Sequence, residues 1–201
     1  MTEYLFWDSC VFIAFLKDQR SFYDVVSIER YLKDAQERRV VIFASSLVFA
    51  EILPSFTAGD ARPYHGDVEA FMDDFSGCIR LIDPDPNIMR IAGRLRDLPY
   101  KKGRSEDRRL STADAVMLAS ALVLVEYYNQ DLTYFHTYDK GGKRDEEGGR
   151  AIPLIGYEEW CEGFDEIGYD RTHYAYRAIA LNRCEPSHPT PQIELDLRSP
   201  Q

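Results

Sequence analysis

The stretch YLFWDSCVFIAFL, residues 4–16, contains a single charged side chain, Asp8, within an otherwise apolar run. Residues 3–7 have the length and apolar character of a buried strand, and residues 10–17 are typical of a helix. A buried carboxylate without a partner costs several kcal/mol. Asp8 therefore requires a helix-capping role, a bound cation or a chemical function.

Short apolar strands and helices alternate along the rest of the chain. Because the strands are continuous apolar runs, they indicate a parallel sheet that is covered on both faces. The sequence thus predicts an α/β fold in three layers, with a central parallel sheet of about four or five strands flanked by helices. The later strands are expected at 40–44, 79–82, 132–136 and 152–155, and the later helices at 22–38, 46–53, 67–76, 86–98 and 112–128.

Polar residues stand where several of these helices should begin. Ser45 or Ser46 could cap the helix that runs to residue 53. Asp85 precedes Pro86, which suits the first turn of a helix, and Ser111 precedes the long apolar helix 112–128. These residues predict the N-termini of three helices.

The 201 residues, of which 45% are hydrophobic, are enough to bury one substantial core. We expect one domain over residues 1–156 and a C-terminal extension over 157–201, partly disordered or bound to a partner. Within that extension, residues 182–201 are rich in proline, although Ile193, Leu195 and Leu197 alternate as in an edge strand.

The cellular compartment can be inferred from the N-terminus and the cysteines. The N-terminus lacks the basic residues of a secretory leader, and no apolar run is long enough to span a membrane. The four cysteines form no CxxC pair, which argues against a disulfide framework and against a zinc site. We therefore expect a cytoplasmic protein without a membrane partner.

The formal net charge is −10, with 34 acidic against 24 basic residues. This argues against general nucleic-acid binding, which depends on neutralising phosphates with Lys and Arg. Two basic groups stand out, one within residues 100–109 and one around residue 140, and each could be a solvated loop or could contact a phosphate. The candidates for binding such a substrate are Lys101, Lys102, Arg104 and Lys140.

Four acidic residues are expected at one edge of the sheet. In open parallel sheets, sites form outside the carboxyl ends of the strands. Asp8 ends the first strand, and Glu51 lies in the helix after the second strand. Asp114 lies in the first turn of the helix 112–128, and Asp139 follows the strand 132–136. All four therefore map to the same edge.

Each of these acids also has a purely structural explanation. Asp8 could cap the helix that follows it, Asp114 stands at a favourable helix N-terminus, and Asp139 could form a turn. Glu51 is the hardest to explain in this way, because it lies in mid-helix among apolar residues. One shared cause accounts for all four more simply than four coincidences.

That shared cause is most simply a divalent cation. Four clustered carboxylates could not all stay ionised without a positive charge among them. Ligation by oxygen alone suits Mg²⁺ or Mn²⁺ rather than zinc, with one or two ions both possible. Such a site is typical of phosphodiester hydrolysis.

Four motifs occur in a fixed order: YLFWDSC before an apolar helix, SSLVFAEIL, STADAVMLASAL and HTYDKG. Together they resemble the PIN domain, the ribonuclease fold of the VapC toxins of bacterial toxin–antitoxin pairs, over residues 3–156. The resemblance implies an Mg²⁺- or Mn²⁺-dependent ribonuclease. The metal-binding, catalytic quartet that it implies is Asp8, Glu51, Asp114 and Asp139, and the supporting hydroxyls are Ser9 and Thr137.

The chain departs from the family pattern in two places. The family often has Asn two residues after its first Asp, where Cys10 stands here, and this puts the support of Asp8 in doubt. The segment after Ile155 also runs beyond the usual end of a compact toxin. The resemblance further implies an RNA substrate, a cognate antitoxin and a homodimer. An exposed set among six aromatic residues would mark an association surface: Phe12, Phe15, Phe22, Tyr23, Phe71 and Phe75.

Other functions fit the sequence less well. A receiver-type phosphoacceptor domain requires paired acids after its first strand, where DSC supplies one, and a DxD-type phosphatase fails at Cys10. The alternative that stays open is a PIN-fold module that binds RNA or a protein without cleaving it. The intact quartet argues against that alternative, because a dead site usually loses a ligand.

Overall fold

The computed structural model describes residues 2–52, 68–102, 106–141, 151–162, 164 and 173–189, with the backbone alone at 68, 101–102 and 106–107. The strands are β1 (Glu3–Trp7), β2 (Val40–Ser45), β3 (Ile79–Ile82), β4 (Lys101–Lys102), β5 (Glu106–Asp107), β6 (Tyr134–His136) and β7 (Arg183–Cys184). The helices are α1 (Ser9–Leu16), α2 (Val25–Gln36), α3 (Val48–Glu51), α5 (Val68–Asp74), α6 (Pro86–Arg96), α7 (Thr112–Tyr127), α8 (Tyr174–Ile179) and the 3₁₀ helix η1 (Tyr157–Trp160).

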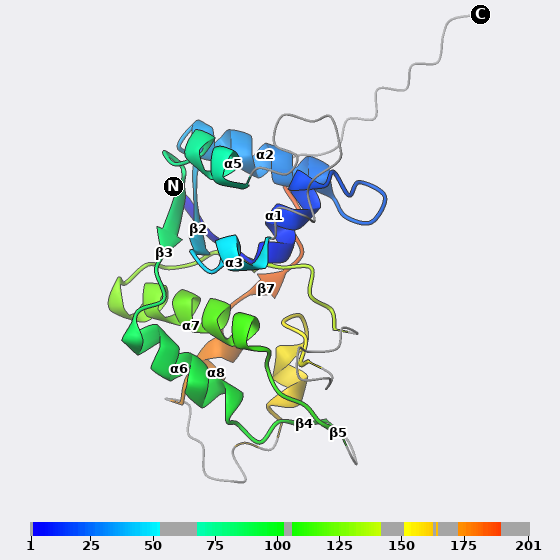
Figure 1. The fold of residues 1–201 in the computed structure, drawn as a ribbon, viewed down its shortest axis with the longest axis vertical. Coiled ribbons are helices and arrows are strands. Elements are labelled where there is room, and N and C mark those ends of the chain that lie inside the picture. The colour runs from blue at the N-terminus through cyan, green and yellow to red at the C-terminus, as the bar shows by residue number, and fades with distance from the viewer. Residues whose placement is uncertain are drawn as a thin grey trace, which may run out of the picture.

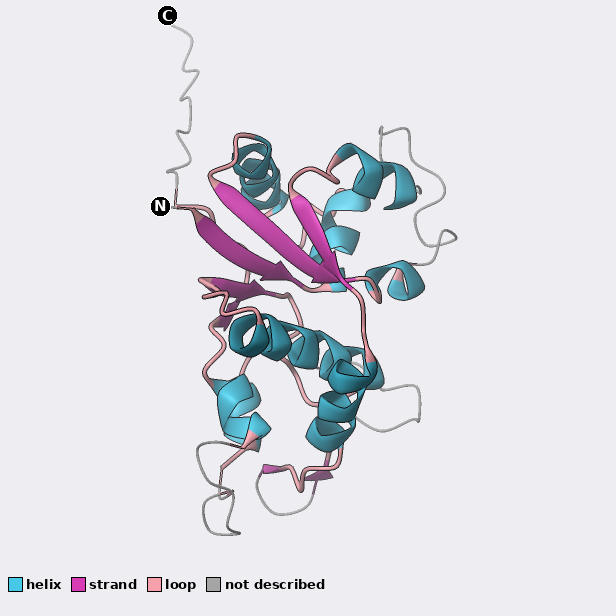
Figure 2. Ribbon diagram, turned by 90° about the vertical axis from the view of Figure 1, so that its left-hand side faces the viewer, coloured by secondary structure: helices cyan, strands magenta, loops and turns pink. Residues whose placement is uncertain are grey.

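In the described part of the chain, five strands form one sheet in which every neighbouring pair is parallel. The order is β3-β2-β1-β6-β7, so β1 is the central strand. Figure 2 shows this sheet between two groups of helices. The expected α/β fold in three layers is confirmed, and it is consistent with a PIN-like arrangement.

Side chains on the two faces of the sheet enter two separate cores. Along β1, Phe6 lies in one core while Leu5 and Trp7 lie in the other, as the two-residue period of a strand requires. The first core packs the sheet against α6, α7 and α8, and the second packs it against α1, α2 and α5 (Figure 1). The central strand is therefore covered on both faces.

Helix α7 has apolar residues around its whole circumference, and its middle is buried on every side. Its residues 115–124 are all buried, and it contacts β2, α6 and α8. With 16 residues it is nevertheless a core helix: among the described residues, no helix is long and apolar enough to cross a membrane. The apolar character of α7 thus reflects its place between the sheet and two other helices.

The structure tests the three predicted N-caps. The hydroxyl of Ser111 accepts from the backbone N–H of Asp114 at 3.0 Å, and Asp85 accepts from the N–H groups of Asn87 and Ile88. These two caps are confirmed. Helix α3 begins at Val48 without a side-chain cap, although Ser45 Oγ accepts from the Leu47 N–H at 3.3 Å. The helix expected at 46–53 is thus shorter in the described residues.

The prediction of a strand at residues 152–155 was wrong. The only described pairing near it is an isolated parallel bridge between Arg109 and Ala151, and Ile152 and Leu154 pack into the core beside α7. Pro153 explains the error, because proline has no N–H to donate to a ladder of hydrogen bonds. The fifth strand is β7 instead, which pairs with β6.

Residues assigned to the C-terminal extension contribute to the same core as residues 1–156. Tyr157, Trp160 and Phe164 are buried in the core that includes α7, and Ala175 and Ala178 of α8 belong to it too. The start of the proline-rich segment, 182–189, includes β7 and lies within the fold. Ile193, Leu195 and Leu197 lie outside the described residues.

Most aromatic side chains of the early helices point inward. Phe12 and Phe71 are fully buried, Phe75 is buried, and the rings of Phe12 and Phe71 meet edge to face at 6.0 Å. Phe15 and Tyr23 are half-buried. Phe22, which is 81% exposed, is the one member of the set on the surface, so the described residues show no aromatic association patch here.

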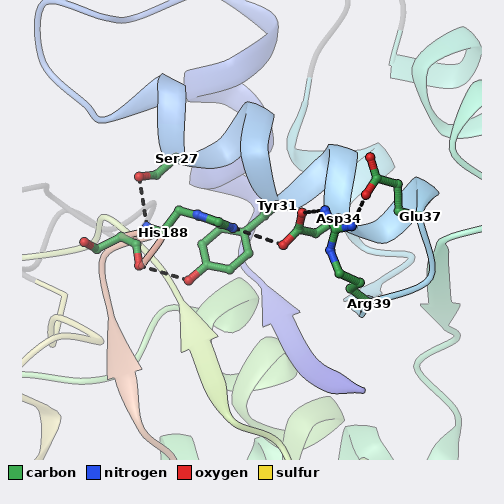
Figure 3. Close-up of polar contacts among 7 residues, drawn as sticks. Ser27, Tyr31, Asp34, Glu37, Arg39 and His188 are labelled. Carbon is green, nitrogen blue, oxygen red and sulfur yellow. Dashed lines mark hydrogen bonds and ion pairs between the residues drawn. The ribbon is translucent and has the colours of Figure 1, made fainter. Parts of the chain in front are cut away.

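Residues 187 and 188 are held against α2 by polar contacts (Figure 3). The Tyr31 hydroxyl donates to the Ser187 carbonyl at 3.0 Å, and the His188 N–H donates to Ser27 Oγ at 2.9 Å. The His188 ring lies 3.1 Å from a carboxylate oxygen of Asp34 and packs edge to face on Tyr31. Helix α2 thus fastens the chain just after β7.

Replacing Tyr31 with Phe tests whether this contact stabilises the fold. Tyr31→Phe leaves the Ser187 carbonyl without its donor, so the free energy of unfolding should fall by about 1 kcal/mol in urea titrations. The matched control Tyr128→Phe removes an exposed hydroxyl and should change stability by less than about 0.5 kcal/mol. A chain that ends at Cys184 lacks Ser187, so in it Tyr31→Phe should leave the free energy of unfolding unchanged. A destabilisation that persists in the shortened chain would refute the contribution of this contact.

Candidate functional site

Asp8 lies at the carboxyl end of β1, where it caps α1. Its Oδ1 accepts from the Ser9 N–H at 2.7 Å, and its side chain is only 5% exposed. Its Oδ2 accepts from Thr137 Oγ1 at 2.7 Å and from Cys10 Sγ at 2.9 Å. Burial raises the pKa of Asp8, and these donors oppose that rise only in part.

Thr137 connects the first and fourth acids of the predicted quartet. It directly follows β6, which pairs with β1 in a register that places His136 beside Trp7. Its fully buried hydroxyl donates to Asp8 and accepts from the Asp139 N–H at 3.0 Å. One hydroxyl therefore fixes the ends of two neighbouring strands relative to each other.

Cys10 occupies the position where the resemblance led us to expect Asn, and it supports Asp8 directly. Besides donating to Asp8, its sulfur accepts from the Tyr138 N–H at 3.1 Å. Burial raises the pKa of the Cys10 thiol well above its usual range, and the charge of Asp8 raises it further. Cys10 therefore stays a thiol that can donate. The sequence pattern missed this role because it signalled only a departure from the family.

Glu51 is the last residue of α3, which follows β2, and its side chain accepts a hydrogen bond from the Ser9 hydroxyl. Ser9 lies in the first turn of α1 and is buried. The Ser9 hydroxyl thus links the edge of β1 to the edge of β2. This places Glu51 next to the residue that follows Asp8, although it is not in mid-helix as expected.

Asp114 lies in the first turn of α7, where Ser111 both caps the helix and contacts the carboxylate. Ser111 Oγ donates to Asp114 Oδ2 at 2.5 Å. The pKa of Asp114 is raised to about 8, first by burial and then by the negative charges of Asp8, Asp139 and Glu51. The other three acids of the predicted quartet are therefore close enough to Asp114 to affect its ionisation.

Asp139 follows β6 and is held by backbone N–H groups on both oxygens. Its Oδ1 accepts from Gly141 and its Oδ2 from Leu154, each at 3.0 Å. Gly141 has φ of +83°, which suits glycine in the tight turn that this bond closes. The structural explanation for Asp139 as a turn residue thus holds alongside its electrostatic contact with Asp114. No pattern in the sequence indicated that Leu154 would contribute.

The carboxylate oxygens at this edge are the right type of ligand for a hard divalent cation, but the side chains are too far apart to bind one as they stand. Carboxylate oxygens are the ligands that Mg²⁺ and Mn²⁺ prefer. Within the described residues, however, no three acidic, histidine or cysteine side chains lie close enough together to hold an ion. Like charges repel, so a cation would have to draw these carboxylates together. The raised pKa values of Asp8 and Asp114 express that repulsion and the cost of burial.

The predicted basic residues are only partly described. The backbones of Lys101 and Lys102 form β4, which pairs antiparallel with β5, and Arg104 lies outside the described residues. Lys140 forms an ion pair with Glu185 at 2.5 Å between two exposed side chains. That pairing would have to open for Lys140 to contact a phosphate.

Comparisons of the chain with protein-family models, with curated proteins and with solved structures gave no match.

The electrostatic coupling predicts how Asp114→Asn changes stability without added cation. The fold raises the Asp114 pKa from 3.8 to about 8, so the contribution of this group to stability is full at low pH and is lost as pH rises toward 8. Asn cannot ionise, so Asp114→Asn removes this pH-dependent loss of stability. Its Tm should exceed that of the wild type by several degrees at about pH 8 and by less at about pH 5, since about 1 kcal/mol moves Tm by about 2–4 °C in a domain of this size.

The exposed acid Asp131, which precedes β6 and so lies at the opposite edge of the sheet, provides the control. Asp131→Asn should show no such pH-dependent gain in Tm. If Asp114→Asn follows the same flat profile as Asp131→Asn, the four acids are not coupled in the way described.

Proposed function

We propose that this protein is a metal-dependent endoribonuclease that hydrolyses RNA phosphodiester bonds, resembling the VapC toxins of toxin–antitoxin pairs. The observation that supports it most is the raised pKa of Asp114, to which Asp8, Glu51 and Asp139 all contribute. Groups with strongly shifted pKa values gather at functional sites, although structural networks can shift them too. The parallel α/β fold and the edge on which these acids lie agree with the proposal.

A bound Mg²⁺ or Mn²⁺ would lower the pKa of a water ligand and stabilise negative charge on phosphoryl oxygens. Asp8, Asp114 and Glu51 would hold the cation, with Asp139 as the fourth acid. The hydroxyls of Thr137, Ser9 and Ser111 orient the carboxylates of Asp8, Glu51 and Asp114. The chain thus contributes the negative charge and the hydroxyl groups that orient it.

The partners that go with this function are part of the proposal. They are an RNA substrate, a cognate antitoxin that blocks the acidic edge, and a second copy of the chain in a homodimer. An inhibitor could offer an Arg guanidinium to the same carboxylates, since such pairs form strong charge-assisted hydrogen bonds. The overall charge of −10 would also attract a basic inhibitor.

A non-catalytic PIN-fold module that binds RNA or a protein is the second candidate. It is favoured by one observation: both oxygens of Asp8 and both oxygens of Asp139 already accept hydrogen bonds from the protein. Carboxylates held in this way could serve the structure alone. Cation binding separates the two candidates.

The first test measures RNA cleavage in Mg²⁺ or Mn²⁺. Asp8→Asn and Asp114→Asn should each reduce the cleavage rate by more than about 100-fold, because each removes a cation ligand while the fold stays intact. Asp139→Asn should keep partial activity, since backbone N–H groups already occupy both of its oxygens. Asp131→Asn is the matched control and should cleave like the wild type. Wild-type cleavage by Asp8→Asn would refute the assignment.

The second test measures cation binding by thermal melting. A cation that binds only the folded state stabilises it by RT ln(1 + [L]/Kd), about 2.7 kcal/mol at 100 times Kd. Mn²⁺ should therefore raise the Tm of the wild type by several degrees at about pH 8, and the rise should shrink at about pH 5, where protons compete for Asp114. NaCl at matched ionic strength should have no such effect. If neither Mg²⁺ nor Mn²⁺ changes the Tm of the wild type, the non-catalytic binding module is the better candidate.

A further inference from the structure

A groove of about 530 Å³ lies on the outer face of α6, beside the chain segment that leads into α7. It is apart from the four acids, and none of its lining residues was among the candidates from the sequence. Its lining is mostly cationic, although the chain as a whole has a net charge of −10. The lining residues are Arg90, Gly93, Arg94, Arg96, Asp97 and Arg109.

The arginines of α6 follow from the way this helix divides its two faces. Ile88, Ile91 and Leu95 are buried against α7, while Arg90 and Arg94 are exposed. Positions 90, 93, 94 and 97 lie three or four residues apart, so they share one face of the helix. Folding requires apolar residues on the inner face but does not require arginine on the outer one.

Two of these guanidinium groups have no acidic partner in the described part of the chain. Arg90 donates only to the Pro86 carbonyl of its own helix, at 3.1 Å, and the described contact of Arg109 is made by its backbone. Arg94 lies over the ring of Tyr174 at 5.6 Å. Uncompensated positive charge in a concave surface favours an anionic ligand.

The chain segment before α7 connects the groove to the acidic edge of the sheet. Arg96 Nε donates to the Leu110 carbonyl at 3.3 Å, which joins the end of α6 to the segment before α7. Arg109 stands two residues before Ser111, whose hydroxyl contacts Asp114. Two residues of extended chain span at most about 7 Å. An anion bound at Arg109 would therefore lie near the first turn of α7.

We infer that this groove binds the sugar–phosphate backbone of single-stranded RNA on its way to the acids at the sheet edge. The inference rests on the proposed function. Arginine binds phosphate oxygens through a planar fork of donors, which suits a chain of phosphates. Among the described residues, the lining includes no aromatic ring on which bases could stack, which favours contact with the backbone over the reading of sequence.

The experiment compares two double variants that remove the same charge. The groove variant is Arg90→Gln with Arg109→Gln, chosen because neither side chain pairs with an acid among the described residues. The control is Lys33→Gln with Arg80→Gln, whose side chains are exposed on α2 and β3. The probe is a fluorescently labelled single-stranded RNA of about 12 nucleotides, titrated in EDTA so that it is not cleaved.

The groove variant should bind this RNA about tenfold more weakly than the wild type. The slope of log K against log salt should flatten by about 1.4, because each phosphate of a single strand that the variant no longer neutralises removes about 0.7. The control should keep the wild-type slope, and both variants should melt like the wild type. An unchanged slope, an equal loss of affinity in the control, or no binding by the wild type would overturn the inference. Competition by polyglutamate as strong as that by unlabelled RNA would assign the groove to an acidic polypeptide instead.

A short chromogenic phosphodiester separates this inference from the proposed function. Such a substrate can reach the acids but is too short to span the groove. Its hydrolysis in Mn²⁺ should be normal in the groove variant and lost in Asp114→Asn. If the wild type fails to hydrolyse it and any RNA while the salt slope still falls in the groove variant, the proposed cleavage fails and the RNA-binding groove stands.

Discussion

The pairing of β1 with a neighbour on each side is the constraint on which the rest of the structure depends. The register places Trp7 beside His136, so the residues that follow these two strands, Asp8 and Thr137, come within hydrogen-bonding distance. A slip of one residue would exchange the cores that Phe6 and Trp7 enter, at a cost no local contact could offset. The candidate site is therefore built by the same hydrogen-bond ladder that holds the sheet together.

That arrangement gathers negative charge where burial already disfavours it. Hydroxyl groups from three different elements donate to the acids: Ser9 from α1, Ser111 before α7 and Thr137 after β6. These donors lower the cost of ionisation without removing it, since the pKa of Asp114 still rises to about 8. Protein chains usually keep such a conflict between local stability and charge only where a site needs it.

The sequence predicted the features that follow from local patterns. The apolar runs indicated β1, β2 and β3 with their parallel neighbours, and Asp85 and Ser111 marked helix starts through ordinary capping chemistry. It also predicted that the acids share an edge, because parallel strands end together. The role of Cys10, the backbone contact of Leu154 and the identity of β7 depended on contacts between distant segments, and no local pattern encodes these. The arginine groove was missed for a related reason, since Arg109 joins the face of α6 only through the fold.

The position of β7 also affects how the chain can fold during synthesis. Its partner β6 ends at His136, and β7 begins at Arg183, 183 − 136 = 47 residues later. At about 5–20 residues per second, a ribosome needs about 2–10 seconds to make that interval. During this time the outer edge of β6 has unpaired N–H and C=O groups, which are open to pairing with other chains. The nascent protein thus passes through a stage in which its sheet is complete on one side only.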